Sequence, residues 1–282
     1  MDKNSTYELS NGVKIPVVGF GTWQTPDGDV AEKSVIAALQ AGYRHIDTAA
    51  IYGNEESVGK GIKNSGVARE EIFVTTKLWN DSHGYEQAKS ALATSLKKLG
   101  LAYVDLYLIH WPNPVEIRKV WEESNQAAWK YMEEALQQGL VKAIGVSNFH
   151  GRHIDSLLKT AKVAPHANQI YLSPSDTQDE IVAYNKQHNI LTQAYSPLGT
   201  GTLLDLPELK AIAAKHNKSV AQVLIRWSLQ QGVNPLPKSV TESRIIENFN
   251  VFDFELDNDD NTAIAKLKGT GKVAANPDEV GW

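Results

Sequence analysis

Residues 71–77 read EIFVTTK and residues 103–110 read YVDLYLIH, and these two stretches decide the fold. Both are apolar at successive positions, as expected of parallel strands that are buried on both faces. Between them, Gln87–Leu99 repeats apolar side chains at helical spacing, which is typical of a helix packed on a sheet. The order strand, helix, strand therefore predicts a βαβ unit.

This alternation continues along the whole chain. The expected strands are Val17–Gly21, Arg44–Asp47, Ile72–Lys77, Val104–His110, Val141–Val146, Asn168–Tyr171, Leu191–Tyr195 and Asn234–Pro237. The expected helices are Ala31–Ala41, Gln87–Leu99, Tyr131–Gln138, Ile154–Thr160, Gln178–Gln187, Val220–Leu229 and Glu242–Asn248. Eight strands with helices between them predict an α/β fold of the (β/α)8 TIM-barrel type, formed as one domain by residues 1–282.

An open, doubly wound sheet is the alternative architecture. It would place a phosphate-binding glycine fingerprint after the first strand, but the stretch GFGTW at residues 19–23 lacks the third glycine and does not open a helix. Ahead of it, Tyr7–Ser10 and Val13–Pro16 flank the pair Asn11-Gly12. This pattern predicts a hairpin with a two-residue turn that closes the bottom of the barrel.

The composition excludes several classes of protein. Apolar residues make up 42% of the chain and charged residues 22%, which rules out disordered and collagen-like chains. The net charge is −5 with interspersed signs, so we expect no nucleic-acid or membrane partner. The absence of cysteine excludes disulfides and thiolate catalysis, and the eight histidines show no metal-ligand spacing. Without a signal peptide or an apolar run of roughly 18 residues, a soluble, cytoplasmic protein is expected.

Polar side chains close three successive predicted strands. Asp47 ends the second strand and Tyr52 follows it in the next loop, while Lys77 ends the third strand and His110 the fourth. Each residue alone has an ordinary structural explanation, such as a turn-forming aspartate or a lysine that reaches for water. Together they are expected at one rim, because the carboxyl ends of barrel strands carry the active site.

This group suits proton transfer to a carbonyl oxygen. A free tyrosine titrates near ~10, and a neighbouring ammonium would lower the pKa of the phenol. Asp47 would keep Lys77 charged, and His110 could orient the carbonyl oxygen. Reduction of the carbonyl would need a coenzyme, since no side chain can supply a hydride.

The chain resembles the aldo-keto reductase family over nearly its full length, and in particular bacterial members of the 2,5-diketo-gluconate reductase type. The matching stretches are GFGTW, YRHIDTAAIYGNEESVG, FVTTKLW, LGLAYVDLYLIHWP, AIGVSNF, AYSPLG and PKSVTESRIIENF. The resemblance implies NADPH-dependent reduction of small aldehydes or ketones. It also implies that Asp47, Tyr52, Lys77 and His110 are the catalytic residues, with Tyr52 as the general acid.

The same resemblance implies a binding site for NADP(H). The residues that match the nicotinamide contacts are Ser147, Asn148, Gln169 and Tyr195, the last stacked on the ring. Further expected contacts are Gly21, Thr22 and Asp47, with Ser196 and Leu198 along the pyrophosphate. The residues that match the adenosine end are Lys238, Ser239, Arg244 and Asn248. A lysine and an arginine there would hold the 2′-phosphate of NADPH, because Arg offers bidentate contacts to phosphate.

Three segments depart from the usual form of the family. A Glu and a His-Pro pair are usual after Gln169, but residues 170–178 read IYLSPSDTQ, so Tyr171 and Ser173 replace those polar side chains. A buried acid–imidazole pair beneath the coenzyme is then expected to be missing, which would affect coenzyme affinity. Trp121 is an addition, expected in a loop that borders the pocket. The tail GTGKVAANPDEVGW, residues 269–282, lacks the usual Arg-Gly-Pro run.

Trp23, Trp79 and Trp111 each follow a strand end, and with His110 they are expected to line an apolar substrate pocket. Alternatively, these three tryptophans could simply pack in the hydrophobic core. Polyols, keto acids, methylglyoxal-like compounds and ketosteroids all remain possible substrates. Two other functions also remain open, a coenzyme-binding regulatory barrel with vestigial catalysis and an aldolase that uses Lys77 as a Schiff-base amine. A monomer is expected.

Overall fold

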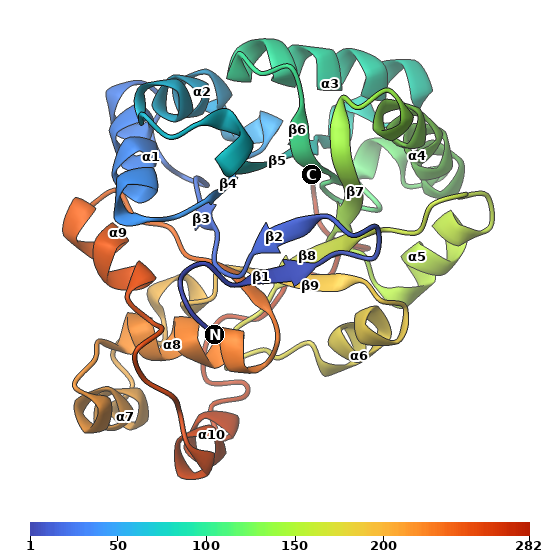
Figure 1. Cartoon of the computed structure of the whole chain (residues 1–282). Coiled ribbons are helices and arrows are strands. Elements are labelled where there is room, and N and C mark those ends of the chain that lie inside the picture. Colours follow the sequence, from blue (N-terminus) through green and yellow to red (C-terminus); the bar gives the residue numbers. More distant parts are fainter.

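Eight parallel strands follow one another in chain order around a central axis in the computed structural model, which describes residues 1–282 (Figure 1). They are β3 (Phe20–Gly21), β4 (His45–Asp47), β5 (Phe73–Leu78), β6 (Val104–Ile109), β7 (Val141–Ser147), β8 (Ala167–Tyr171), β9 (Leu191–Tyr195) and β10 (Asn234–Leu236). At the seam, the amide of Gly19 donates to Pro235 O and that of Gly21 to Pro237 O, both at 3.0 Å. These bonds join the first strand to the last, so the predicted (β/α)8 barrel is confirmed.

Helices form a ring outside the strands (Figure 1). They are α1 (Asp29–Ala41), α2 (Glu55–Asn64), α3 (Tyr85–Leu99), α4 (Trp121–Gln137), α5 (Gly151–Leu158), α6 (Asp179–Gln187), α7 (Pro207–His216), α8 (Val220–Gln230), α9 (Glu242–Phe249) and α10 (Asn258–Ala265). The sequence did not predict α2, α7 or α10. The sequence pattern predicts the start of α4 too late, since the helix begins at Trp121 and buries Asn125 and Ala128 before the predicted start at Tyr131.

No helix has both the length and the apolar sequence that a membrane crossing requires.

The glycines of α2 explain why this helix escaped prediction. Gly59 and Gly61 lower the intrinsic helix propensity of the segment. In the structure both glycines are required by packing: a Cβ on Gly59 would overlap the backbone of Leu99 at the end of α3. A Cβ on Gly61 would lie 2.7 Å from the Cβ of Val35 in α1. The glycines therefore let three neighbouring helices approach closely.

An N-terminal hairpin covers one end of the barrel (Figure 1). Its strands are β1 (Thr6–Glu8) and β2 (Lys14–Pro16), and Leu9 and Ile15 pack with Phe73 and Leu106 from the barrel interior. The predicted two-residue turn is wrong. Leu9 N donates to Val13 O at 2.9 Å across a three-residue loop, in which Gly12 has the positive φ of 83°. This is the bulged form of a three-residue hairpin loop.

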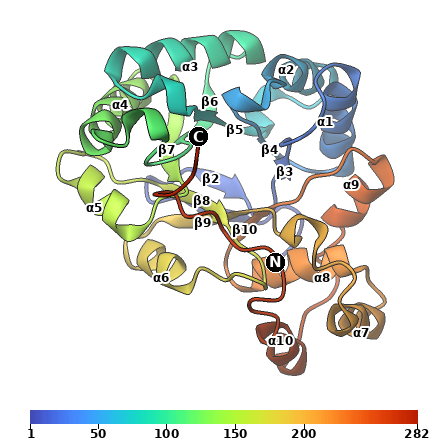
Figure 2. The same ribbon diagram turned by 180° about the vertical axis from the view of Figure 1, so that it is seen from behind.

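The segment that follows α10 crosses the opposite end of the barrel. Figure 2, viewed from behind, shows it running from α10 past β10 and β9 toward β7. The hairpin and this tail, residues 269–282, therefore cover opposite ends of the same barrel.

We predict that Gly59→Ala destabilises the protein by about 1–3 kcal/mol, because the added methyl group meets backbone that cannot move aside. Helix propensity alone predicts the opposite effect, an increase of about 1 kcal/mol in the free energy of unfolding. Urea unfolding followed by circular dichroism measures the difference. Gly281→Ala is the control, because a Cβ there meets nothing within 4 Å. A Gly59→Ala variant as stable as the parent would refute the packing explanation.

Candidate active site

Side-chain alternation along the strands brings three polar residues to the carboxyl end of the barrel interior. On β5, Phe73, Thr75 and Lys77 point inward, since the outward-facing Val74 and Leu78 belong to the core beneath the helices. Asp47 ends β4 directly beside this strand, and His110 follows β6. A short 3-10 helix, η1 (Ala50–Tyr52), then turns Tyr52 back over the same rim.

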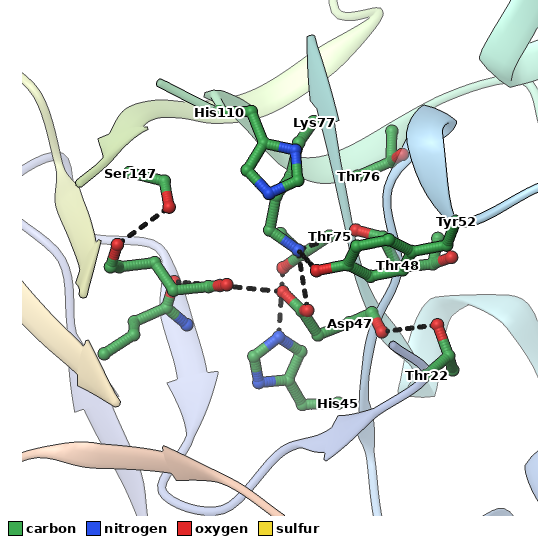
Figure 3. Close-up of polar contacts among 12 residues, drawn as sticks. Thr22, His45, Asp47, Thr48, Tyr52, Thr75, Thr76, Lys77, His110 and Ser147 are labelled. Atoms are coloured by element: carbon green, nitrogen blue, oxygen red, sulfur yellow. Dashed lines mark hydrogen bonds and ion pairs between the residues drawn. The ribbon is translucent and has the colours of Figure 1, made fainter. Parts of the chain in front are cut away.

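The ammonium group of Lys77 is the centre of the site (Figure 3). It donates to Asp47 Oδ1 at 2.7 Å, to the backbone oxygen of Thr48 at 2.8 Å and to the hydroxyl of Tyr52 at 3.3 Å. The side chain of Lys77 has no exposed surface. All three donor positions of the ammonium are thus used, and its orientation toward the phenol is fixed.

Asp47 is held in turn by a buried polar chain. Its Oδ2 accepts a hydrogen bond from Gln169 Nε2 at 2.8 Å, and the same amide group lies 3.4 Å from Gln193 Oε1. Gln193 donates to Asn234 Oδ1 at 2.8 Å, and Asn234 donates to the backbone oxygen of Val17 at 2.7 Å. Side chains from β8, β9 and β10 therefore fix the position of the carboxylate that holds Lys77.

Burial controls the protonation of this group. Burial raises the pKa of Tyr52 well above its ordinary value, and the Asp47 carboxylate adds to the rise. The sequence predicted a lowered pKa for this phenol because of Lys77, and that prediction is wrong because burial outweighs the neighbouring cation. Burial also lowers the pKa of Lys77, while Asp47 acts in the opposite direction. Tyr52 is therefore protonated at neutral pH.

His110 presents a neutral imidazole to the site. Burial lowers the pKa of His110 well below its ordinary value, and the positive charge of Lys77 lowers it further. The ring packs edge-to-face on Trp79, with centroids 5.1 Å apart, and on Tyr52 at 5.9 Å. It lies beside Lys77 in Figure 3. A neutral imidazole carries one N–H, which can donate to a substrate oxygen.

One large cavity, about 1050 Å³, opens above this group. The predicted site residues that line it are Gly21, Trp23, Asp47, Tyr52, Trp79, His110, Trp111, Asn148, Gln169, Tyr195, Ser196, Leu198, Lys238, Ser239, Arg244 and Asn248. Lys77 lies behind Tyr52. Thr22 and Ser147 also lie behind the wall: Thr22 Oγ1 donates to Asp47 O at 3.0 Å, and Ser147 Oγ donates to Gln169 O at 2.8 Å. Direct coenzyme contacts of Thr22 and Ser147 stay predictions.

The loop after β7 shapes the wall next to His110. Asn148 adopts a left-handed conformation with φ of 60°, and its side-chain amide donates to His110 O at 3.0 Å. Its Oδ1 accepts a hydrogen bond from the hydroxyl of Tyr195 at 2.8 Å. Asn148 thereby ties the ends of β6, β7 and β9 together at the cavity wall.

The part of the cavity lined by β10 and α9 carries two cations, Lys238 and Arg244, and one carboxylate, Glu247. Lys238 follows β10 and donates to Gln24 O at 3.2 Å, and Arg244 lies on α9 with a guanidinium group that has no partner within the chain. Asn248 is buried one turn further along, and its side-chain amide also makes no hydrogen bond within the chain. A free guanidinium and a free amide at a cavity wall fit a phosphate-bearing ligand.

Aromatic and apolar side chains surround the catalytic end. Trp23, Trp79 and Trp111 line the cavity as predicted, and the sequence missed Ile51 and Trp282. The rings of Trp111 and Trp282 pack edge-to-face at 5.6 Å. Trp121 was predicted to border the pocket, and this is wrong. It opens α4 and packs on His153 at 5.1 Å, outside the cavity lining.

The tail that carries Trp282 is anchored by a carboxylate. Asp278 accepts hydrogen bonds from Asn113 Nδ2 at 2.9 Å and His153 Nε2 at 3.0 Å, and it forms an ion pair with Arg152. These contacts hold the pKa of Asp278 well below its ordinary value, although its partial burial opposes them. Arg118 donates to Val280 O at 2.6 Å, which fixes the backbone beside Trp282.

Comparison with known proteins assigns the chain to a family. The model of the aldo/keto reductase family matches residues 17–268. Glyoxal reductase of Bacillus subtilis is 49% identical over 98% of this chain and 97% of its own length. Methylglyoxal reductase DkgA of Escherichia coli is 44% identical over the whole of both chains. The chain therefore belongs to the aldo/keto reductase family.

Solved structures agree with this assignment. An aldo/keto reductase from Brucella melitensis superposes with a TM-score of 0.89 at 49% identity, over 95% of this chain and 99% of that one. The aldo-keto reductase of Bombyx mori in complex with NADP superposes with a TM-score of 0.86 at 38% identity, over 95% of this chain and 94% of that one. The protein is an oxidoreductase that uses NADP(H) to reduce carbonyl groups.

We predict that His110 stays neutral across the pH range in which an ordinary histidine titrates, near ~6.5, because burial and Lys77 disfavour its charged form. A lowered pKa means that the neutral ring persists as the pH falls through that range. Nitrogen chemical shifts of the imidazole, measured by NMR between pH 8 and 5.5, provide the test. The signal that disappears in His110→Gln identifies the ring. A titration midpoint near ~6.5 for that signal would contradict the prediction.

Proposed function

We propose that this enzyme reduces small aldehydes, ketones and dicarbonyl compounds with NADPH, and that Tyr52 is the general acid. One observation carries the proposal: the hydroxyl of Tyr52 lies at the cavity surface, 3.3 Å from a fully buried ammonium that Asp47 holds in place. A phenol so placed can donate its proton to a substrate oxygen in the cavity.

The residues of this chain perform the proton transfer. Tyr52 keeps its proton at neutral pH, because its pKa is raised, and donates it to the carbonyl oxygen of the substrate. The phenolate that remains faces the Lys77 ammonium, and Asp47 keeps that ammonium charged and oriented. The N–H of neutral His110 donates to the same carbonyl oxygen and holds it near the phenol.

Residues along the cavity fit the coenzyme. Bound NADPH supplies the hydride that the carbonyl carbon accepts. Its nicotinamide would be held by Asn148, Gln169 and Tyr195, with Gly21 beside them. Its pyrophosphate would lie along Ser196 and Leu198. Its adenosine 2′-phosphate would be held by Lys238, Ser239, Arg244 and Asn248. The unpaired guanidinium and amide at that end are the structural support for this orientation.

The substrate class follows from the relatives and the apolar walls. The names of two relatives specify glyoxal and methylglyoxal, which are small dicarbonyl compounds. The indoles of Trp23, Trp79 and Trp111 line the catalytic end here, and indoles suit small carbonyl compounds. We also propose that the enzyme acts as a monomer in the cytoplasm, because one chain supplies every site residue and NADPH is regenerated inside the cell.

Two other functions have less support. A Schiff-base aldolase needs an amine that a substrate can reach, but the Lys77 side chain has no exposed surface and its ammonium has three partners. A regulatory barrel with vestigial catalysis would have no need for an assembled proton donor, and here Asp47, Tyr52 and Lys77 are in hydrogen-bond contact.

We predict that Tyr52→Phe lowers kcat for methylglyoxal reduction by about 10²- to 10⁴-fold, because it removes only the transferable proton. Loss of NADPH absorbance measures turnover, and fluorescence titration should show an NADPH Kd within about twofold of the parent. Tyr103→Phe is the matched control, because the hydroxyl of Tyr103 has no partner and lies outside the cavity. A Tyr52→Phe enzyme with more than about a tenth of the parent turnover would refute this assignment.

We predict that Arg244→Ala weakens NADPH binding by about tenfold or more and leaves NADH binding almost unchanged, because the lost contact is charge-assisted and specific for the 2′-phosphate. Some preference for NADPH should survive, since Lys238 lines the same end of the cavity. Titration of the parent and the variant with both coenzymes tests this. If the binding of NADPH and NADH were weakened equally, Arg244 would contact a part that both coenzymes contain, and not the 2′-phosphate.

A further inference from the structure

The backbone of Lys272 is fixed by hydroxyl groups from the segment that follows β8. Lys272 O accepts hydrogen bonds from Tyr171 OH at 2.8 Å and from Ser175 Oγ at 2.7 Å. Ser173 Oγ connects the two donors, at 3.3 Å from Tyr171 OH and 2.8 Å from Ser175 Oγ. Tyr171, Ser173 and Ser175 are all buried, so this hydroxyl network is a rigid anchor for the tail.

Close packing fixes the neighbouring tail residues as well. Gly269 N donates to Ser175 O at 2.8 Å, and Ala274 N donates to Asp176 Oδ2 at 2.9 Å. A Cβ on Gly271 would lie 2.9 Å from Thr202 Oγ1 and 3.1 Å from Ser175 Cβ, so the tail lies directly on the loop after β9. The segment from Gly269 to Ala274 is therefore held on both sides.

Lys272 is one of the residues that line the large cavity. Its backbone oxygen contacts Tyr171, whose ring lies 5.9 Å from that of Tyr195, and both tyrosines line the same cavity. Thr200 and Gly201, from the loop on which the tail packs, also line this cavity. The ammonium of Lys272 is exposed and has no hydrogen bond or ion pair within the chain.

The cations of the cavity lining indicate which part of a phosphate-bearing ligand this ammonium can bind. Lys238, Arg244 and Lys272 are these cations, and the first two lie together at the adenosine end. NADPH also carries two negative charges on the pyrophosphate, which joins its nicotinamide and adenosine halves. In the proposed orientation that group lies along Ser196 and Leu198, and Lys272 is the lining cation that the adenosine 2′-phosphate does not use.

We propose that Lys272 binds the pyrophosphate of the coenzyme, and that the hydroxyls of Tyr171 and Ser175 position it by holding its carbonyl oxygen. This inference rests on the proposed coenzyme orientation. It assigns a function to the tail and to the segment after β8, because together they would hold a cation next to the pyrophosphate of the coenzyme. Lys272 is a binding residue, and Tyr171 and Ser175 are positioning residues.

Calorimetric titration with three ligands tests the proposal. ADP-ribose contains the pyrophosphate without a 2′-phosphate, 2′-AMP contains a 2′-phosphate without the pyrophosphate, and NADPH contains both. Lys272→Met should weaken ADP-ribose and NADPH by about three- to tenfold and change 2′-AMP by less than about twofold. Lys272→Arg should keep most of the affinity. Lys266→Met is the matched control, because Lys266 is exposed, lies only six positions before Lys272 and is not part of the cavity lining.

The anchor is tested by a double-mutant cycle. Tyr171→Phe should weaken ADP-ribose and NADPH less than Lys272→Met does, and it should have no further effect once Lys272 is replaced. Unchanged ADP-ribose binding in Lys272→Met would overturn the inference, as would an equal loss of 2′-AMP, which would place Lys272 at the adenosine end. Failure of the parent to bind NADPH, or equal effects of Arg244→Ala on both coenzymes, would instead refute the proposed coenzyme site.

Discussion

The ion pair between Lys77 and Asp47 is the constraint on which the catalytic end of the barrel depends. An ammonium with no exposed surface has lost its water, and only a close carboxylate and further hydrogen bonds make that burial tolerable. Removal of one partner from such a pair typically costs about 3–5 kcal/mol. Asp47 must therefore stay in place, and the chain through Gln169, Gln193 and Asn234 holds it from the opposite side of the barrel.

The same constraint links stability to chemistry. The contacts that make burial of Lys77 tolerable also point its ammonium at Tyr52, so the fold itself sets the geometry of the proposed proton donor. Burial keeps the phenol protonated, and in the proposed reaction the ammonium would stabilise the anion that forms when the proton leaves. The site is thus prepared for a change of charge before any substrate arrives, which is the electrostatic preorganisation that lowers a barrier.

The sequence predicted the barrel strands well, because strands that are buried on both faces are apolar at successive positions. This pattern can be recognised without knowing the tertiary contacts. It missed α2, where Gly59 and Gly61 serve close helix packing, and α10, whose start depends on a reciprocal cap between Asp257 and Asp260. The grouping of Asp47, Tyr52, Lys77 and His110 could be predicted because the carboxyl ends of barrel strands share one rim. The raised pKa of Tyr52 was not visible, because burial is a property of the assembled site. Tail residues such as Trp282 reach the cavity through long-range contacts that no local pattern encodes.

The hydroxyl anchor of the tail has a consequence for how this sequence can change. Tyr171 and Lys272 are 101 positions apart, yet the hydroxyl of one is satisfied by the carbonyl of the other. A tail with a different backbone path would leave the buried hydroxyls of Tyr171 and Ser175 without this acceptor, which is unfavourable in a buried environment. The two segments are therefore epistatic, and substitutions in one restrict those tolerated in the other. A chimera that exchanges the tail between related barrels will need to exchange the segment after β8 with it.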